Sequence, residues 1–168
     1  MRQGCAGPER RVSLAQLPRP AGLIPHKGDA VLLDEISYAD DHRLKAHLVV
    51  RQATAFSDPF GNLPAWVGPE LMAQAISALS GLRSLRARGQ AAPIGLLLGV
   101  RSYRAIVGEF RCGEALQIEV AESSEDEDGM AVFDCRICRA GEVVASGTLT
   151  VFQPADDSFL ERECARNA

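Results

Sequence analysis

The sequence predicts an α+β domain in which a curved antiparallel sheet wraps around one long central helix. Two observations lead to this prediction: one long segment has helical character, and apolar segments with strand-like alternation lie on both sides of it in the chain. The chain has 168 residues, of which 46% are hydrophobic, so it suits a single domain with a sizeable core.

Two strands of a hairpin are expected before the helix. Residues 31–36 are apolar and rich in β-compatible side chains, and residues 44–51 alternate so that every second side chain is apolar. Asp40 and Asp41 predict the turn between these strands. Residues 54–68 combine proline, glycine and aromatic residues, which favours an ordered loop leading into the helix.

The helix is expected to begin near residues 67–69 and to end at Arg88. Pro69 suits the first helical turn because its missing N–H would have no partner there, and Gly89 suits the position just after the last turn. Small residues along the helix permit close packing against a broad partner, for which a curved sheet is the natural candidate. Four further strands are expected at residues 94–105, 115–123, 130–138 and 142–152.

We expect three parts along the chain. Residues 1–21, rich in Arg, Gly and Pro, predict a flexible N-terminal segment, and residues 22–153 predict the folded domain. Pro154 follows the last expected strand, so residues 154–168 predict a C-terminal tail.

Composition excludes several classes of function. The formal net charge is −4 at pH 7 and the basic residues form no stripe, so nucleic-acid binding is not expected. The longest apolar stretches, such as residues 94–100, are far shorter than the roughly 20 residues needed to span a bilayer. Charged residues and prolines interrupt the N-terminal segment, which does not match a signal peptide. We therefore expect a soluble, cytoplasmic protein.

The five cysteines are scattered along the chain and lack the spacing of a disulfide framework, which fits a reducing compartment. Cys135 and Cys138 form a C-x-x-C pattern, but three positions along a strand turn two side chains to opposite faces. We interpret them as structural thiols rather than as a redox or metal pair. No phosphate-binding glycine loop, flavin motif or metal-ligand spacing is present in the sequence, so we expect no cofactor and no metal.

Three motifs resemble the 3-hydroxyacyl-acyl carrier protein dehydratases of the FabA/FabZ type. Residues 23–34, LIPHKGDAVLLD, are similar to the LxPHRxPFLLVDR opening of that family. Residues 70–75, ELMAQA, are similar to the E-x-[LM]-A-Q-A at the start of its central helix, and residues 98–116 match more loosely a strand, a basic residue and a turn. The I-P-H-x-G and W-V-G-x-E-x-M-A-Q-A patterns resemble in particular the ApeP-like subgroup from aryl polyene pigment clusters.

This resemblance implies a hotdog domain over residues 22–153. It also implies dehydration of 3-hydroxyacyl thioesters, carried on acyl carrier protein, to trans-2-enoyl thioesters in a fatty-acid-like or aryl polyene pathway. Hotdog dehydratases place the base and the acid of one site on different protomers. A homodimer, or a heterodimer with a second hotdog dehydratase, is therefore expected.

β-Dehydration requires a base at the α-carbon, an acid at the β-hydroxyl and donors to the thioester carbonyl. Glu70 matches the acid of the family; the alternative is a carboxylate favoured by the helix dipole. The N–H of Gly68 is a candidate donor to the carbonyl, or this glycine is a helix cap. Gln74, one helical turn after Glu70, is expected to orient acid or substrate, or to be a satisfied core amide. Trp66 is a candidate tunnel residue, with core packing as the alternative.

The base departs from the family pattern, because Phe56 stands where the family has a histidine in a G-H-F-P-G loop. Of the three histidines, only His26 has a motif around it, and histidine is a common base in catalysis near neutral pH. The alternative is a structural histidine that holds its loop. His42 is expected in an exposed turn and His47 on the outer face of a strand. Asp58 is either a weak base in the loop or a turn residue.

Three functions follow from these candidates. In the first, the protein is a dehydratase with His26 as base and Glu70 as acid. In the second, it is a non-catalytic or half-catalytic hotdog subunit that lends Glu70 to a composite site with a complete dehydratase. The third is an acyl-thioester hydrolase, in which Glu70 would activate water.

Overall fold

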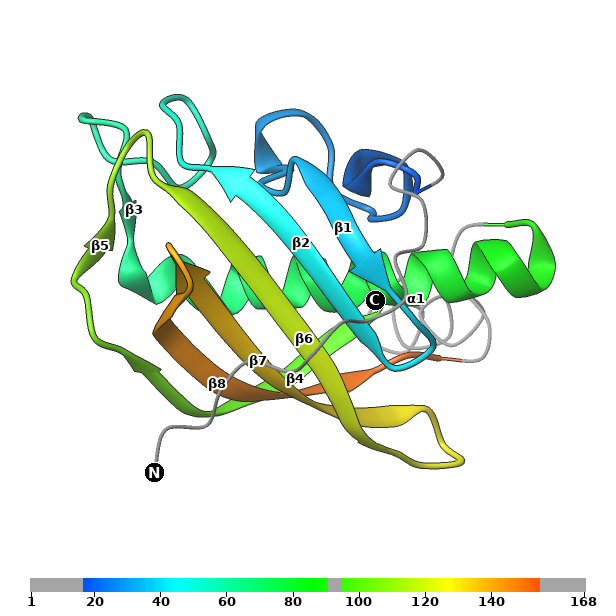
Figure 1. The fold of residues 1–168 in the computed structure, drawn as a ribbon. Coiled ribbons are helices and arrows are strands. Elements are labelled where there is room, and N and C mark those ends of the chain that lie inside the picture. Colours follow the sequence, from blue (N-terminus) through cyan, green and yellow to red (C-terminus); the bar gives the residue numbers. More distant parts are fainter. Residues whose placement is uncertain (1–16, 91–94, 155–168) are drawn as a thin grey trace, which may run out of the picture.

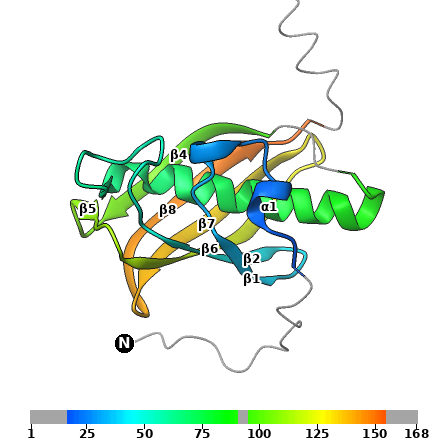
Figure 2. The same ribbon diagram turned by 90° about the horizontal axis from the view of Figure 1, so that it is seen from above.

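A sheet of six antiparallel strands curves around one long helix in the computed structural model, which describes residues 17–90 and 95–154. The order of strands across this sheet is β1 (Glu35–Ala39), β2 (Arg43–Val49), β6 (Ala115–Glu125), β7 (Met130–Arg139), β8 (Glu142–Phe152) and β4 (Leu96–Ala105). The first long strand after the helix therefore pairs with the last strand of the described residues. The helix lies behind the sheet in Figure 1, and the view from above shows the sheet bending around it (Figure 2). The predicted α+β architecture is confirmed.

The elements of the described residues are as follows. The strands are β1 (Glu35–Ala39), β2 (Arg43–Val49), β3 (Leu63–Pro64), β4 (Leu96–Ala105), β5 (Glu109–Phe110), β6 (Ala115–Glu125), β7 (Met130–Arg139) and β8 (Glu142–Phe152). The helix α1 spans Gly68–Arg88, and three 3-10 turns, η2 (Pro20–Gly22), η3 (Gly28–Ala30) and η4 (Ala65–Val67), lie before it. None of these helices is both long and apolar enough to cross a membrane.

The helix has the predicted ends. Pro69 lies in its first turn, and Gly89 ends it in the left-handed conformation, with its N–H bonded to the carbonyl of Leu85. Glycine adopts that conformation without the steric cost that a side chain brings. The four predicted strands after the helix are present as well, although residue 94, the expected start of the first of them, lies outside the described residues.

The first strand begins later than predicted. Residues 31–36 were expected to form it, but β1 starts at Glu35 and residues 31–34 are irregular. The reason is that the N–H of Leu32 donates to a side-chain oxygen of Gln74 on α1 at 3.0 Å. Leu32 is still buried, which explains its apolar character. The two-residue pair of β3 and β5 was not predicted, because residues 54–68 were interpreted as a loop throughout.

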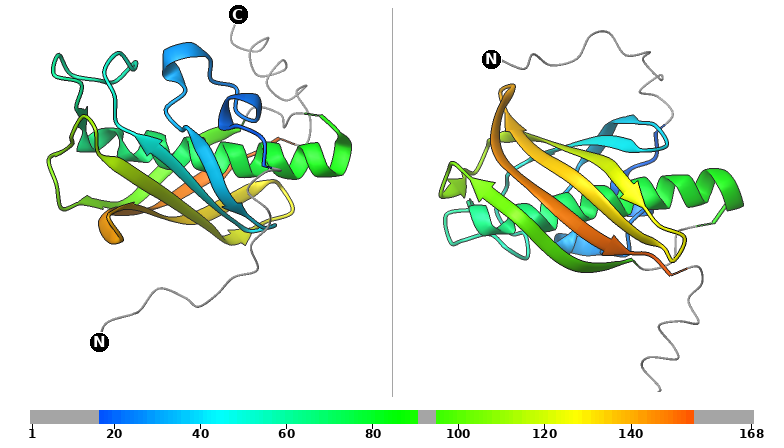
Figure 3. Two further views of the ribbon diagram at one scale, coloured as in Figure 1. Left: turned by 45° about the horizontal axis from the view of Figure 1, so that its top comes forward. Right: turned by 90° about the horizontal axis from the view of Figure 1, so that it is seen from below.

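The core lies between the sheet and α1. Leu44, Ala46 and Leu48 of β2 are buried, while His47 on the same strand is half-buried on the outer face that Figure 3 shows from below. Cys135 of β7 is buried in the core, and burial, together with the nearby charge of Asp134, raises the pKa of its thiol to about 12. Cys138, in contrast, lines a depression on the outer face. The prediction of two thiols on opposite faces is confirmed.

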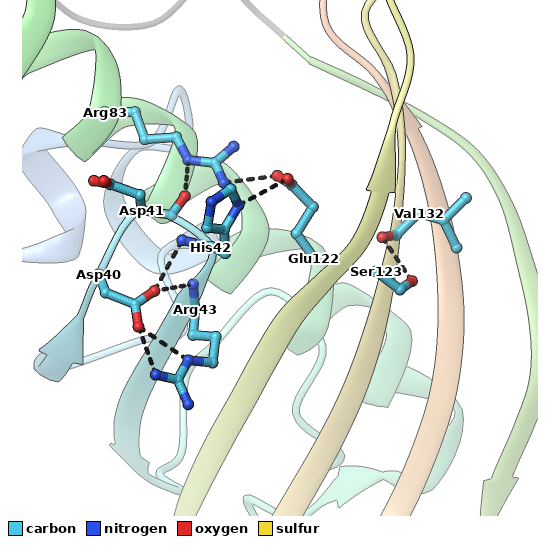
Figure 4. A network of polar contacts seen from close by, with 8 residues as sticks. All are labelled: Asp40, Asp41, His42, Arg43, Arg83, Glu122, Ser123 and Val132. Atoms are coloured by element: carbon cyan, nitrogen blue, oxygen red, sulfur yellow. Dashed lines mark hydrogen bonds and ion pairs between the residues drawn. The ribbon is translucent and has the colours of Figure 1, made fainter. Parts of the chain in front are cut away.

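The turn between β1 and β2 is fixed to the end of α1. Arg83 of the helix donates to the buried carboxylate of Glu122 on β6 (Nη2 to Oε2, 2.6 Å) and to the backbone carbonyl of Asp41 (2.5 Å). Nδ1 of His42 lies 3.1 Å from the other oxygen of Glu122 (Figure 4). These contacts join hairpin, helix and sheet, so the two N-terminal strands hold a fixed position relative to α1.

The same turn depends on the charge of Asp40. Burial alone would raise the pKa of this carboxyl, but hydrogen bonds from the Tyr38 hydroxyl, the His42 and Arg43 backbones and the Arg43 side chain lower it to about 2. A carboxyl group whose pKa is lowered by folding stabilises the folded state at pH values above its pKa in the unfolded chain, which is near 4. This stabilisation is lost as the pH falls to the folded-state pKa of about 2.

Asp40→Asn is therefore expected to lower the free energy of unfolding by about 1 kcal/mol at pH 7, allowing for partial exposure of the carboxylate. The loss should shrink as the pH falls from 4 towards 2. Urea unfolding at these pH values measures both effects. Asp41→Asn, an exposed neighbour, is the control and should change stability by less than about 0.5 kcal/mol. An equal loss in Asp40→Asn at all pH values would contradict this prediction.

Candidate active site

The loop that carries His26 is held against α1 at two points. At the first, Gly81 lets the backbone of Leu23 approach the helix: a Cβ on this glycine would lie only 2.3 Å from the carbonyl oxygen of Leu23. Leu23 and Ile24 are buried at this contact. Any side chain at position 81 would therefore move the loop.

The second point is the buried amide of Gln74. Its oxygen accepts the N–H of Leu32 (3.0 Å), and its nitrogen donates to the carbonyl of Ala30 (2.8 Å). The same nitrogen donates to Oε1 of Glu70, one turn earlier on the helix, at 2.9 Å. The side chain of Gln74 is inaccessible to solvent, so these partners replace water completely. Both roles expected for Gln74, a satisfied core amide and an orienting group for Glu70, describe contacts that the structure contains.

His26 and Glu70 meet between these two points. Nε2 of His26 lies 3.1 Å from Oε1 of Glu70, and their side chains are 33% and 29% exposed. Nδ1 of His26 is buried and has no hydrogen-bond partner among the described residues. Only Nε2 of the ring is therefore placed to exchange a proton, and it faces a carboxyl group. Imidazole and carboxyl groups are the side chains that most often transfer protons in general acid–base catalysis.

The pair borders a pocket of about 230 Å³ between α1 and the ends of β4 and β8. Because the walls are mostly apolar, the pocket suits an apolar ligand with its reactive part at the His26–Glu70 end. Its lining residues are Leu23, Pro25, His26, Glu70, Ala73, Ile76, Ser77, Ser80, Gly95, Leu96, Leu97, Val151, Phe152 and Gln153.

Two predicted site residues lie elsewhere. The N–H of Gly68 donates to the carbonyl of Ala65, and a Cβ on Gly68 would lie 2.0 Å from the hydroxyl of Tyr103. That hydroxyl also donates to the carbonyl of Ala65 (2.5 Å), so Gly68 makes room for a contact between β4 and the helix start. Trp66 is 68% exposed and does not line the pocket. Core packing, the alternative for Trp66, is wrong because η4 turns this side chain outward.

The remaining candidates have structural surroundings. Asp58 accepts the N–H groups of Phe60 and Asn62, both at 2.8 Å, as a turn residue does. His42 is exposed as expected, and His47 contacts the hydroxyl of Ser37 at 2.6 Å on the outer face of the sheet. Asp58, His42 and His47 do not line the His26–Glu70 pocket. The sequence analysis missed two contacts that shape the site, that of Gly81 with Leu23 and that of Tyr103 with Ala65, because no motif or spacing indicates them.

Comparisons with known proteins place the chain in a class and in a family. The class is the hotdog proteins, which confirms the predicted fold. The model of the ApeP-like family, described as ApeP dehydratase, matches residues 18–161, and the chain belongs to this family. A search among curated proteins found no match.

Three solved structures illustrate the range of the similarity. The dehydratase heterocomplex ApeI:P from Xenorhabdus doucetiae is 28% identical, with a TM-score of 0.78, and the match covers 86% of this chain and 96% of that chain. A hypothetical thioesterase with coenzyme A from Streptococcus pneumoniae is 20% identical, with a TM-score of 0.54 and coverage of 72% and 88%. The PaaI protein of E. coli is 12% identical, with a TM-score of 0.52 and coverage of 70% and 81%. The last two similarities show the fold alone.

Gly81→Ala tests the loop contact. Alanine favours the helix by up to about 1 kcal/mol, but the clash with a backbone carbonyl is of the overpacking kind, which costs about 1–3 kcal/mol. We expect a net loss of stability and displacement of His26, measured by urea unfolding and by the shift of its ring signals in NMR spectra. In the control Gly22→Ala, the new Cβ meets no atom within 4 Å. Unchanged His26 signals in Gly81→Ala would contradict the proposed contact.

Proposed function

We propose that this chain dehydrates 3-hydroxyacyl thioesters carried on acyl carrier protein, with His26 as the base and Glu70 as the acid, and that it works as one subunit of a hotdog heterodimer. The observation that carries the proposal is the 3.1 Å contact between Nε2 of His26 and Oε1 of Glu70 beside a largely apolar pocket. Membership of a dehydratase family supports the reaction. The carrier protein follows from the resemblance in the motifs around these two residues.

The two groups complete the elimination without an outside proton. Nε2 of His26 removes the proton from the α-carbon of the substrate while the protonated carboxyl of Glu70 gives its proton to the β-hydroxyl. The C–O bond breaks, water leaves and the α–β double bond forms. The proton on Nε2 then passes to Oε1 of Glu70 across their contact, which restores the starting state.

Gln74 is the positioning residue in this proposal. Its amide nitrogen donates to Oε1 of Glu70 and to the carbonyl of Ala30. One buried side chain therefore holds both the acid and the loop of His26 in position. This arrangement restricts the rotation of the carboxyl group before substrate binds. Fixed geometry of this kind lowers the entropic cost of reaching the transition state.

The free edge of β4 is the proposed contact with the second hotdog subunit. Within the described residues β4 is an end strand that pairs only with β8, and its Leu97, Leu98 and Val100 are exposed. An apolar edge strand with unpaired backbone groups readily pairs with another chain. The similarity to a structure described as a dehydratase heterocomplex supports a second hotdog subunit as the partner.

The proposal predicts the loss of activity in two variants. His26→Ala and Glu70→Gln are each expected to lower kcat/KM at least about 100-fold, because each removes one proton-transfer group. The assay measures by mass the enoyl product formed from 3-hydroxyacyl-acyl carrier protein, with this chain alone and with a second hotdog dehydratase of the same source. His47→Ala is the matched control, since its ring lies on the outer face of the sheet, and should keep full activity.

The other outcomes separate the alternatives. If the pair of subunits is active and only Glu70→Gln abolishes product, the chain lends Glu70 to a composite site and His26 is structural. Free acid in place of enoyl product identifies a thioesterase. Full activity in both variants contradicts a catalytic role for this pair of residues.

A further inference from the structure

The pocket beside the His26–Glu70 pair runs along one face of α1. Glu70, Ala73, Ser77 and Ser80 line it at intervals of three and four residues, which places them on one stripe of the helix. Ser80 lies ten positions after Glu70, which corresponds to about 15 Å along the helix axis. A ligand held at Glu70 would therefore extend towards Ser80.

Two polar side chains that contact each other, Ser80 and Gln153, line the pocket at the end farthest from Glu70 along α1. The hydroxyl of Ser80 donates to the side-chain oxygen of Gln153, which follows β8. The backbone N–H of Gln153 donates to the carbonyl of Gly129 at 2.9 Å, so the β6–β7 turn holds this residue in place. Gly129 has a positive φ of 90°, and a Cβ there would lie 2.3 Å from the carbonyl oxygen of Gln153. The wall is thus fixed from both the helix and the sheet.

A second pocket of about 330 Å³ begins on the other side of this contact and shares Ser80 and Gln153 with the first. Its walls are charged, with Arg83 and Arg88 on the helix and residues 125–128 of the β6–β7 turn opposite them. An apolar chain that entered this space would displace water from charged groups without replacing their hydrogen bonds. The contact between Ser80 and Gln153 therefore separates a largely apolar space from a charged one.

We propose that Ser80 and Gln153 form the end wall of the acyl pocket and set the longest acyl chain that the protein accepts. This inference rests on the proposed function, since it takes the pocket as the site of the acyl group. Chains that end before Ser80 gain affinity with each methylene they bury, at about four-fold per group. Longer chains meet the wall and gain nothing further.

Binding of saturated acyl-pantetheines of increasing chain length, measured by calorimetry on the full chain, tests the wall without requiring catalysis. Affinity is expected to rise about four-fold per methylene up to a limit and then to stop rising. Gln153→Ala should move this limit by about one or two methylenes and no further, because the chain gains the space that the side chain leaves and then meets the charged second pocket. Ser77→Leu should move it to shorter chains, because it fills the pocket one turn nearer to Glu70.

Ser84→Ala is the matched control, since Ser84 lines only the second pocket and should leave the limit unchanged. The same limit in wild type, Gln153→Ala and Ser77→Leu would overturn the end wall while leaving the acyl pocket in place. A lack of binding at every chain length, by this chain alone and by this chain together with the second hotdog dehydratase, would overturn both the wall and the proposed function.

Discussion

The buried amide of Gln74 is the interaction on which the candidate site depends. It bonds the backbone of Ala30 and Leu32 and the carboxyl group of Glu70, so one side chain fixes the loop of His26 relative to the helix. A buried amide left without these partners would cost about 1–3 kcal/mol for each unsatisfied group. The loop, the helix and the acid therefore form together, and the geometry of the pair is a consequence of folding.

The parts of the fold that the sequence predicts well are those with local causes. Pro69 and Gly89 mark the ends of α1 through their own backbone preferences, and alternation along β2 assigns each residue to one face of the sheet. The predicted start of β1 was wrong because the interaction that keeps residues 31–34 out of the strand is not local in the sequence. Residues 31–34 have a strand-like composition, but Leu32 uses its N–H for a side chain far along the chain. Alternation and composition contain no information about such a partner.

In the candidate site, too, contacts with local causes were predicted from the sequence and contacts with non-local causes were not. The spacing of Glu70 and Gln74 on one helical turn predicts that they meet, and they do. Contact between His26 and Glu70 depends instead on how closely the loop approaches the helix, which Gly81 decides through the absence of a side chain. For Gly68, the sequence suggested a role that the local backbone does not leave open. A glycine before a helix suggests a free donor, yet its N–H is already used within η4.

A pair within one chain changes what a second subunit would contribute. Under the proposed function, both groups lie on one protomer, so the partner need not supply an acid or a base, and Phe56 in place of a histidine does not leave the site incomplete. Leu97 lines the pocket and is exposed on β4, so a partner on this edge would cover one wall of the site. Removing water from a half-exposed pair strengthens the electrostatic interactions within it. Under the proposed function, association at β4 thus promotes catalysis by covering the site rather than by adding residues to it.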